Sequence, residues 1–95
     1  MEDLEVKISF EESLNASLAF VNNEQAGICN YIVEGDKWNI VHTRVKDEFG
    51  GRGIAKKLVL KIIEEARKRN IKIKPTCSFA VKMMDNPEYQ DILDK

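Results

Sequence analysis

The chain is poor in the residues that build disulfide-stabilised or metal-stabilised domains. Its 95 residues include two cysteines, Cys29 and Cys77, and one histidine, His42. Two cysteines so far apart in sequence form neither a disulfide framework nor a zinc-binding motif. We therefore expect free thiols, a reducing cytoplasmic setting and no metal site.

An excess of charge of either sign is also missing, because 15 basic and 16 acidic residues nearly cancel. A near-neutral chain has no general electrostatic attraction to nucleic acid or to an anionic membrane, so we expect neither as a partner. No apolar run approaches the length that crosses a bilayer, and the acidic first residues do not resemble a secretory signal. Without repeats or linkers, the length predicts one domain over residues 1–95.

Alternating apolar residues predict four strands joined by short turns. Residues 4–10 are apolar at every second position, which is typical of a half-buried strand. Further strands are predicted over 16–21, 26–33 and 38–45. Apolar residues on both faces of 26–33 favour a central position in the sheet. Short turns between successive strands indicate an antiparallel meander.

Alternation within residues 38–45 also assigns side chains to faces of that strand. One face is expected to carry Trp38, Ile40, His42 and Arg44, and the other Asn39, Val41, Thr43 and Val45. His42 would then have apolar neighbours, which fits a buried core histidine and a histidine in a catalytic pocket equally well. Histidine titrates near neutral pH, which suits proton transfer.

The periodicity becomes helical after the strands. Apolar residues recur at helical spacing over 54–66, which predicts a long amphipathic helix that Asn70 ends. A fifth strand over 71–75 and a short helix over 79–84 follow. A last helical turn or two, begun by Pro87, is expected over 88–93. The predicted class is α+β, with the fifth strand roughly parallel to the fourth.

A glycine-rich loop, Phe49-Gly50-Gly51-Arg52-Gly53, precedes the long helix. The first N–H groups of a helix lack partners within the helix, and the helix dipole adds positive charge, so such an end can hold a phosphate. The missing Cβ atoms of Gly51 and Gly53 would let an anion approach the main chain, with Arg52 and Lys56 at the rim. The spacing matches neither a P-loop nor a Rossmann fingerprint. From the loop alone, a tight turn that needs glycine for its geometry is an equally good explanation.

Residues 45–58 resemble the pyrophosphate-binding segment of the GNAT acetyltransferase superfamily. Gly50 stands where glutamine or arginine is usual, Gly53 matches the central glycine and Ala55 the last position. The resemblance extends to a small-protein branch of the superfamily. It is carried by three further stretches: His42-Thr43, Pro75-Thr76-Cys77-Ser78-Phe79-Ala80-Val81-Lys82, and Asn86-Pro87-Glu88-Tyr89.

The resemblance implies a truncated acyl-CoA N-acyltransferase fold, in which strands four and five splay apart around the arm of coenzyme A. It implies coenzyme contacts at the strand edge and at the loop, from Thr43, Val45, Gly50, Gly51, Arg52, Gly53, Ile54, Ala55 and Lys56. The implied activity is acetyl transfer from acetyl-CoA, a small-molecule donor, to an amine that the sequence does not identify. Monomer and homodimer are both open.

Some features of the superfamily are missing. Residues 38–45 contain no glutamate that could be a general base, and the chain is too short for the usual additional elements of an acceptor site. Two alternatives therefore stay open: a coenzyme-binding module without catalysis, and a protein-interaction domain that keeps only the fold.

The resemblance places the thioester near His42 and Cys77. Because Cys77 precedes a predicted helix, its thiolate would be stabilised, and it could accept the acyl group or act as a base beside a basic His42. The alternative is a small buried side chain. Packing in the core is the expected role of Cys29, Phe79, Met83 and Met84, and also of Tyr89, for which a general-acid role is the weaker alternative.

Overall fold

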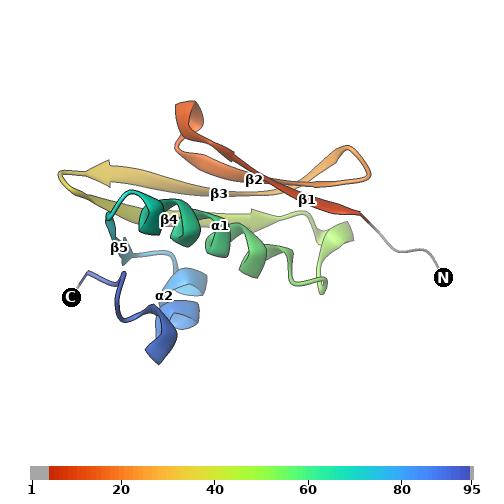
Figure 1. Ribbon diagram of the computed structural model, residues 1–95. Helices are drawn as coiled ribbons and strands as arrows, with labels where there is room; N and C mark the ends of the chain where they lie inside the picture. Colours follow the sequence, from red (N-terminus) through yellow and green to blue (C-terminus); the bar gives the residue numbers. More distant parts are fainter. Residues whose placement is uncertain (1–4, 95) are drawn as a thin grey trace.

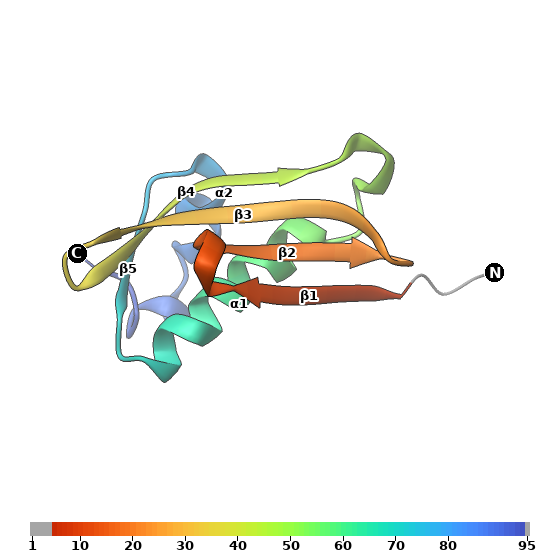
Figure 2. The same cartoon turned by 90° about the horizontal axis from the view of Figure 1, so that it is seen from above.

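The computed structural model describes residues 5–94 and contains one five-stranded sheet in the order β1-β2-β3-β4-β5 (Figure 2). The first four strands are antiparallel neighbours, and the fifth pairs parallel to the fourth. The predicted meander and the parallel fifth strand are confirmed. Their bounds are β1 Val6–Glu11, β2 Ala16–Val21, β3 Glu24–Glu34, β4 Lys37–Val45 and β5 Lys72–Pro75. The first strand begins at Val6, and Leu4, predicted as part of it, lies outside the described residues.

Helix α1, Ile54–Lys68, lies across one face of the sheet (Figure 1). Its apolar stripe forms the centre of the core with the inner residues of the strands, and Leu58, Val59 and Ile62 are fully buried. The helix ends at Lys68, and Asn70, the predicted stop, follows it with a left-handed φ of 56° and donates its N–H to the carbonyl of Arg67. None of the helices within residues 5–94 is long and apolar enough to cross a membrane.

The opposite face of the sheet carries no α-helix among residues 5–94 (Figure 1). Strand β3 is central in the sheet, as predicted, but it is not buried on both faces along its length. Cys29 and Tyr31 face α1 and are buried, whereas Ile32 and Val33 are about half exposed. Their end of the strand extends past the covering helix into the β3–β4 hairpin.

A β-bulge in β4 overturns the predicted face of His42. Tyr31 of β3 pairs with Ile40, but the preceding Asn30 pairs with His42, so Val41 has no partner on β3. One extra residue reverses the faces of all residues that follow it. Trp38 and Ile40 are buried on the α1 side, whereas His42 is exposed on the other face.

The predicted face of Arg44 is wrong for the same reason. Arg44 follows the bulge and is exposed like His42. Thr43 and Val45 instead face α1, on the side of Trp38 and Ile40. The bulge thus places polar Thr43 beside the core of the protein.

The C-terminal segment differs from the prediction over 88–93. Helix α2, Ser78–Met84, is followed by a single 3₁₀ turn, η3, Pro87–Tyr89. Leu93 is not helical and forms a parallel bridge with Ile73. The N–H of Ile73 donates to Ile92 and its carbonyl accepts from Asp94, both at 2.8 Å. The free edge of β5 therefore gains partners that a longer helix would not supply.

Candidate functional site

The loop before α1 has the exposed amide groups expected of an anion-binding turn. Gly51 and Gly53 have φ values of 75° and 73°, and a Cβ added to either would meet no atom within 4 Å. The first hydrogen bond of α1 runs from Lys57 N–H to Gly53 O, and no side chain caps this end. The N–H groups of Ile54 and Ala55 therefore have no partner within the helix.

Glycine at both positions is required by the backbone, because an L-residue with a side chain is strained at positive φ. The turn geometry alone thus explains Gly51 and Gly53. The same geometry leaves open space next to the main chain, so the structural and the anion-binding explanations are compatible. Gly50 differs, since its φ of −65° is open to any residue.

The edge of β4 becomes free beyond Ile40. Pairing with β5 ends at the Ile40–Pro75 pair, where the Ile40 carbonyl accepts the N–H groups of Thr76 and Cys77 at 2.9 and 3.0 Å. From there the chain turns into α2 and leaves β4. Among the described residues, no strand pairs with this edge of residues 41–45. The predicted splaying of strands four and five is present in the structure.

A cavity of about 390 Å³ lies between the loop, α1 and α2. The sequence-predicted residues Val45, Gly50, Gly51, Gly53, Ile54, Ala55 and Lys56 line it together with Phe49 and Phe79. Arg52 is exposed in the same loop but does not line the cavity, and Thr43 lies two residues before Val45 on the same face of β4. The structure thus brings most of the predicted loop and strand positions to one cavity.

Phe79 was expected in the core, but it is 40% exposed and lines this cavity. It is the second residue of α2, close to the point where the chain turns away from β4. A single phenylalanine in an apolar run gives no sequence signal that distinguishes burial in the core from exposure at a cavity. Met84, in contrast, is buried as predicted.

Cys77 lies at the N-terminal end of α2, where the two strands separate. Its Sγ donates to Thr43 Oγ1 at 3.5 Å. Burial raises the pKa of this thiol, but the hydrogen bond with Thr43 and the backbone N–H groups of Ala80, Phe79 and Thr43 outweigh that effect, so the pKa is lowered. The sulfur forms no capping hydrogen bond with α2, and the nearby helical N–H groups act on it through their dipoles. A lowered pKa favours the thiolate, which is the nucleophilic form.

His42 does not share the surroundings of Cys77. It extends from the exposed face of β4, whereas its neighbour Thr43 extends toward the side of Cys77. No hydrogen bond joins His42 to Cys77 among the described residues, so the structure does not contain a paired imidazole and thiol. Any role of His42 would be exercised from the outer side of the sheet.

Cys29 and Tyr89 are buried, as predicted for both. The Cys29 sulfur lies 3.4 Å from Thr43 Oγ1, so this hydroxyl has a thiol on either side. The sequence did not indicate this arrangement, because it joins three different strands or loops. Among residues 5–94 no group of three potential metal-binding side chains occurs.

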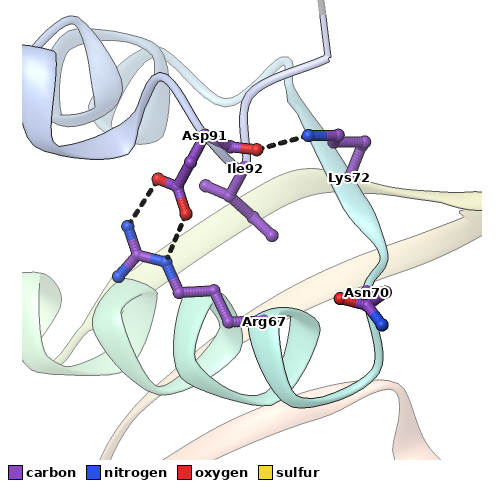
Figure 3. Close-up of a pocket in the computed structure, with 5 residues that line it drawn as sticks. All are labelled: Arg67, Asn70, Lys72, Asp91 and Ile92. Carbon is purple, nitrogen blue, oxygen red and sulfur yellow. Dashed lines mark hydrogen bonds and ion pairs between the residues drawn. The ribbon is translucent and has the colours of Figure 1, made fainter.

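A separate cavity of about 300 Å³ lies at the C-terminal end of α1 (Figure 3). Arg67 donates from Nε and Nη2 to the two carboxylate oxygens of Asp91, at 3.2 and 2.9 Å. Lys72 donates to the carbonyl oxygen of the same aspartate. Arg67, Lys72 and Asp91 thus find their partners within the protein, and their contacts hold the C-terminal segment against α1.

Comparison with protein families gives one match that covers most of the chain. The family described as GCN5-related N-acetyl-transferase matches residues 17–92. A comparison with curated proteins finds none that matches.

Several solved structures are similar to this one, among them the following two. The solution structure of a GCN5-like candidate N-acetyltransferase from Staphylococcus aureus is 37% identical, with a TM-score of 0.69 over 99% of this chain and 91% of that one. The crystal structure of a ribosomal-protein-alanine N-acetyltransferase from Brucella melitensis biovar Abortus 2308 is 22% identical, with a TM-score of 0.58. That match covers 74% of this chain and 59% of that one, and it shows a shared fold alone.

Proposed function

This chain belongs to the family of GCN5-related N-acetyltransferases, and from that premise we propose that it transfers an acetyl group from acetyl-CoA to an amine. We further propose that residues 1–95 act as one minimal domain. The single observation that carries the proposal is the cavity in which the free edge of β4 meets the uncapped start of α1.

The chemistry of the cavity fits the parts of coenzyme A. A pyrophosphate is anionic, and the unpaired N–H groups of Ile54 and Ala55 would donate hydrogen bonds to it, with Gly51 and Gly53 leaving open space. Lys56 lines the cavity and would add positive charge. Arg52 would add charge from the exposed side of the loop.

The pantetheine arm carries amide groups, which need hydrogen-bond partners when they are buried. The backbone of β4 at Thr43 and Val45 would supply them, because β5 does not use this edge. Phe79 would cover the arm from α2, since its exposed ring lines the same cavity.

Cys77 is proposed to act on the acetyl group in one of two ways. In a two-step route, its thiolate attacks the thioester carbonyl carbon, the bond to the coenzyme sulfur breaks, and the coenzyme leaves as a thiolate. The amine then attacks the new Cys77 thioester, the carbon–sulfur bond breaks, and the amine loses a proton to a base. In a one-step route the amine attacks the coenzyme thioester directly, Cys77 takes a proton from the amine as a base, and the bond to the coenzyme sulfur breaks, so that the coenzyme leaves as a thiolate.

His42 is proposed as the base that removes the proton from the amine. Because His42 lies on the face of β4 opposite Cys77, the amine nitrogen would have to reach the thioester past the unpaired edge of residues 41–45.

Calorimetric titration combined with an assay of coenzyme release tests the proposal. We expect one acetyl-CoA bound per chain, competition by free CoA, and release of CoA that depends on an added amine. Binding without release to any of a panel of amines would favour a coenzyme-binding module. Absence of heat with either ligand would mean that the chain keeps the fold without the coenzyme site.

A further inference from the structure

The hydroxyl of Thr43 lies between two thiols that come from different parts of the fold. Its Oγ1 is 3.4 Å from the sulfur of Cys29 on β3 and 3.5 Å from that of Cys77 before α2. Cys29 is fully buried, and Cys77 is partly exposed where the strands separate. A hydroxyl has one hydrogen to donate, so the two contacts with sulfur depend on each other.

The direction of these hydrogen bonds must change when Cys77 loses its proton. As a thiol, Cys77 donates to Thr43 Oγ1. As a thiolate it can only accept, so the Thr43 hydrogen must then point to Cys77. The hydrogen is free to do so when Cys29 is the donor to the Thr43 oxygen, and either of these two atoms can be the donor.

Cys29 stays protonated under the conditions in which Cys77 ionises. Burial is the largest effect and raises the pKa of Cys29, the hydrogen bond with Thr43 lowers it and the charge of Cys77 raises it, and together these effects bring it to about 11. Cys29 is thus an S–H donor at neutral pH. Of the other titratable groups on the surrounding elements, His42 of β4 lies on the outer face of the sheet, and Lys56 of α1 and Lys82 of α2 are exposed.

We propose that Cys29 is a positioning residue for Cys77, acting through Thr43. The buried thiol donates to the Thr43 oxygen and turns the hydroxyl hydrogen toward the Cys77 sulfur when that sulfur is a thiolate. No bond to sulfur forms or breaks in Cys29. The inference rests on the proposed function only in that the proposed function makes Cys77 a catalytic residue.

The pH profile of Cys77 alkylation by iodoacetamide tests this without the coenzyme. Peptide mapping by mass spectrometry assigns the modified cysteine. Cys29→Ala should move the midpoint of the profile to higher pH and slow alkylation at neutral pH by up to about fivefold, because Thr43 donates more weakly to the thiolate when its own oxygen accepts no hydrogen bond. The plateau at high pH, where every Cys77 is a thiolate, should stay unchanged.

Two further variants separate positioning from packing. Cys29→Ser keeps a donor and should restore the midpoint toward that of the wild type, whereas Cys29→Val fills the site without a donor and should behave like Cys29→Ala. The valine variant also serves if the alanine variant does not fold, which circular dichroism would show.

Thr43→Val completes the experiment, since Cys29 is proposed to act only through this hydroxyl. Thr43→Val should shift the midpoint at least as far as Cys29→Ala, and the double variant no further than Thr43→Val alone. An unchanged midpoint in Cys29→Ala, failure of serine to restore it, or an additional full shift in the double variant would each overturn the proposal. Because no coenzyme is present, these results are independent of whether acetyl transfer is observed.

Discussion

The carbonyl oxygen of Ile40 accepts a hydrogen bond of 3.0 Å from the backbone N–H of Cys77, and this bond marks the point where β5 leaves β4. Beyond it, residues 41–45 keep their partners on β3 but have none on the other side among the described residues. The bond also places Cys77 at the apex of the gap. One backbone contact thus fixes both the free strand edge and the thiol beside it.

The glycine loop gives the first prediction. Gly53→Ala should lower the free energy of unfolding by about 1 kcal/mol, because a side chain is strained at a φ of 73°. It should also weaken acetyl-CoA binding in calorimetry, because the strained backbone moves the amides at the start of α1.

Gly35→Ala is the matched control for this variant. Gly35 has a φ of 62°, and like Gly53 it has open space where a Cβ would be, but it lies in the β3–β4 turn. The free energy of unfolding of Gly35→Ala should fall by a similar amount, while its affinity for acetyl-CoA stays unchanged. Equal affinities in the two variants would show that the loop does not hold the coenzyme.

The second prediction concerns Cys77. In Cys77→Ala, turnover should fall by roughly 10²-fold or more if the thiol carries the acetyl group or acts as the base. Intact mass spectrometry of the wild type with acetyl-CoA should show a gain of one acetyl group, absent in Cys77→Ala. Unchanged turnover in the variant removes both catalytic roles, and full loss of turnover without an adduct in the wild type favours the base.

The third prediction follows from the close approach of β3 and β4 at Gly27. A Cβ there would lie 2.8 Å from the carbonyl oxygen of Arg44 and 3.2 Å from side-chain atoms of Leu58 and Val45. Gly27→Ala should therefore lower the free energy of unfolding in urea by about 1–3 kcal/mol, the usual cost of overpacking. A variant as stable as the wild type would mean that the two strands separate more easily than this packing indicates.

The fourth prediction concerns the pH dependence of stability. The hydrogen bond from Arg69 lowers the pKa of Glu65; burial opposes this, and Lys68 adds to it. A carboxyl whose pKa is lowered by folding stabilises the protein above its unfolded pKa, and this contribution is lost as the pH falls through its folded pKa. Glu65→Gln should thus be less stable than the wild type near neutral pH, with the difference shrinking in acid.

Urea denaturation at pH values of about 7 and about 3 measures that difference. Glu64→Gln is the control, because Glu64 is adjacent on α1 but its side chain is 57% exposed and its ion pairs lie at the surface. If the difference in free energy of unfolding between wild type and Glu65→Gln does not change with pH, the ion pair of Glu65 with Arg69 does not have the stabilising role assigned to it.

The sequence predicted the elements of this fold well, because each follows from a local pattern. Helix α1 and the stop at Asn70 after it come from apolar spacing and a residue that tolerates positive φ. The bulge at Val41 gave no such signal: the alternation of residues 38–45 is regular, and only pairing with β3 shows the extra residue. The face of His42 could not be predicted for this reason.

Other features of the site depend on contacts between distant segments. The loop positions around Gly53 were predicted because the motif is contiguous. In contrast, the exposure of Phe79 and the contact of Cys29 with Thr43 require knowledge of how α2, β3 and β4 meet. Similarly, the bridge from Leu93 forms because β5 has a free edge, which is a property of the sheet and not of the C-terminal sequence.

Backbone amide chemical shifts, followed by NMR while acetyl-CoA is added, show directly where the coenzyme binds. If it binds between the loop and the edge of β4, the largest changes should fall on the amides of residues 51–56 and on Thr43 and Val45. Changes confined to the cavity around Arg67 and Lys72, or no changes at saturating coenzyme, would rule this binding site out.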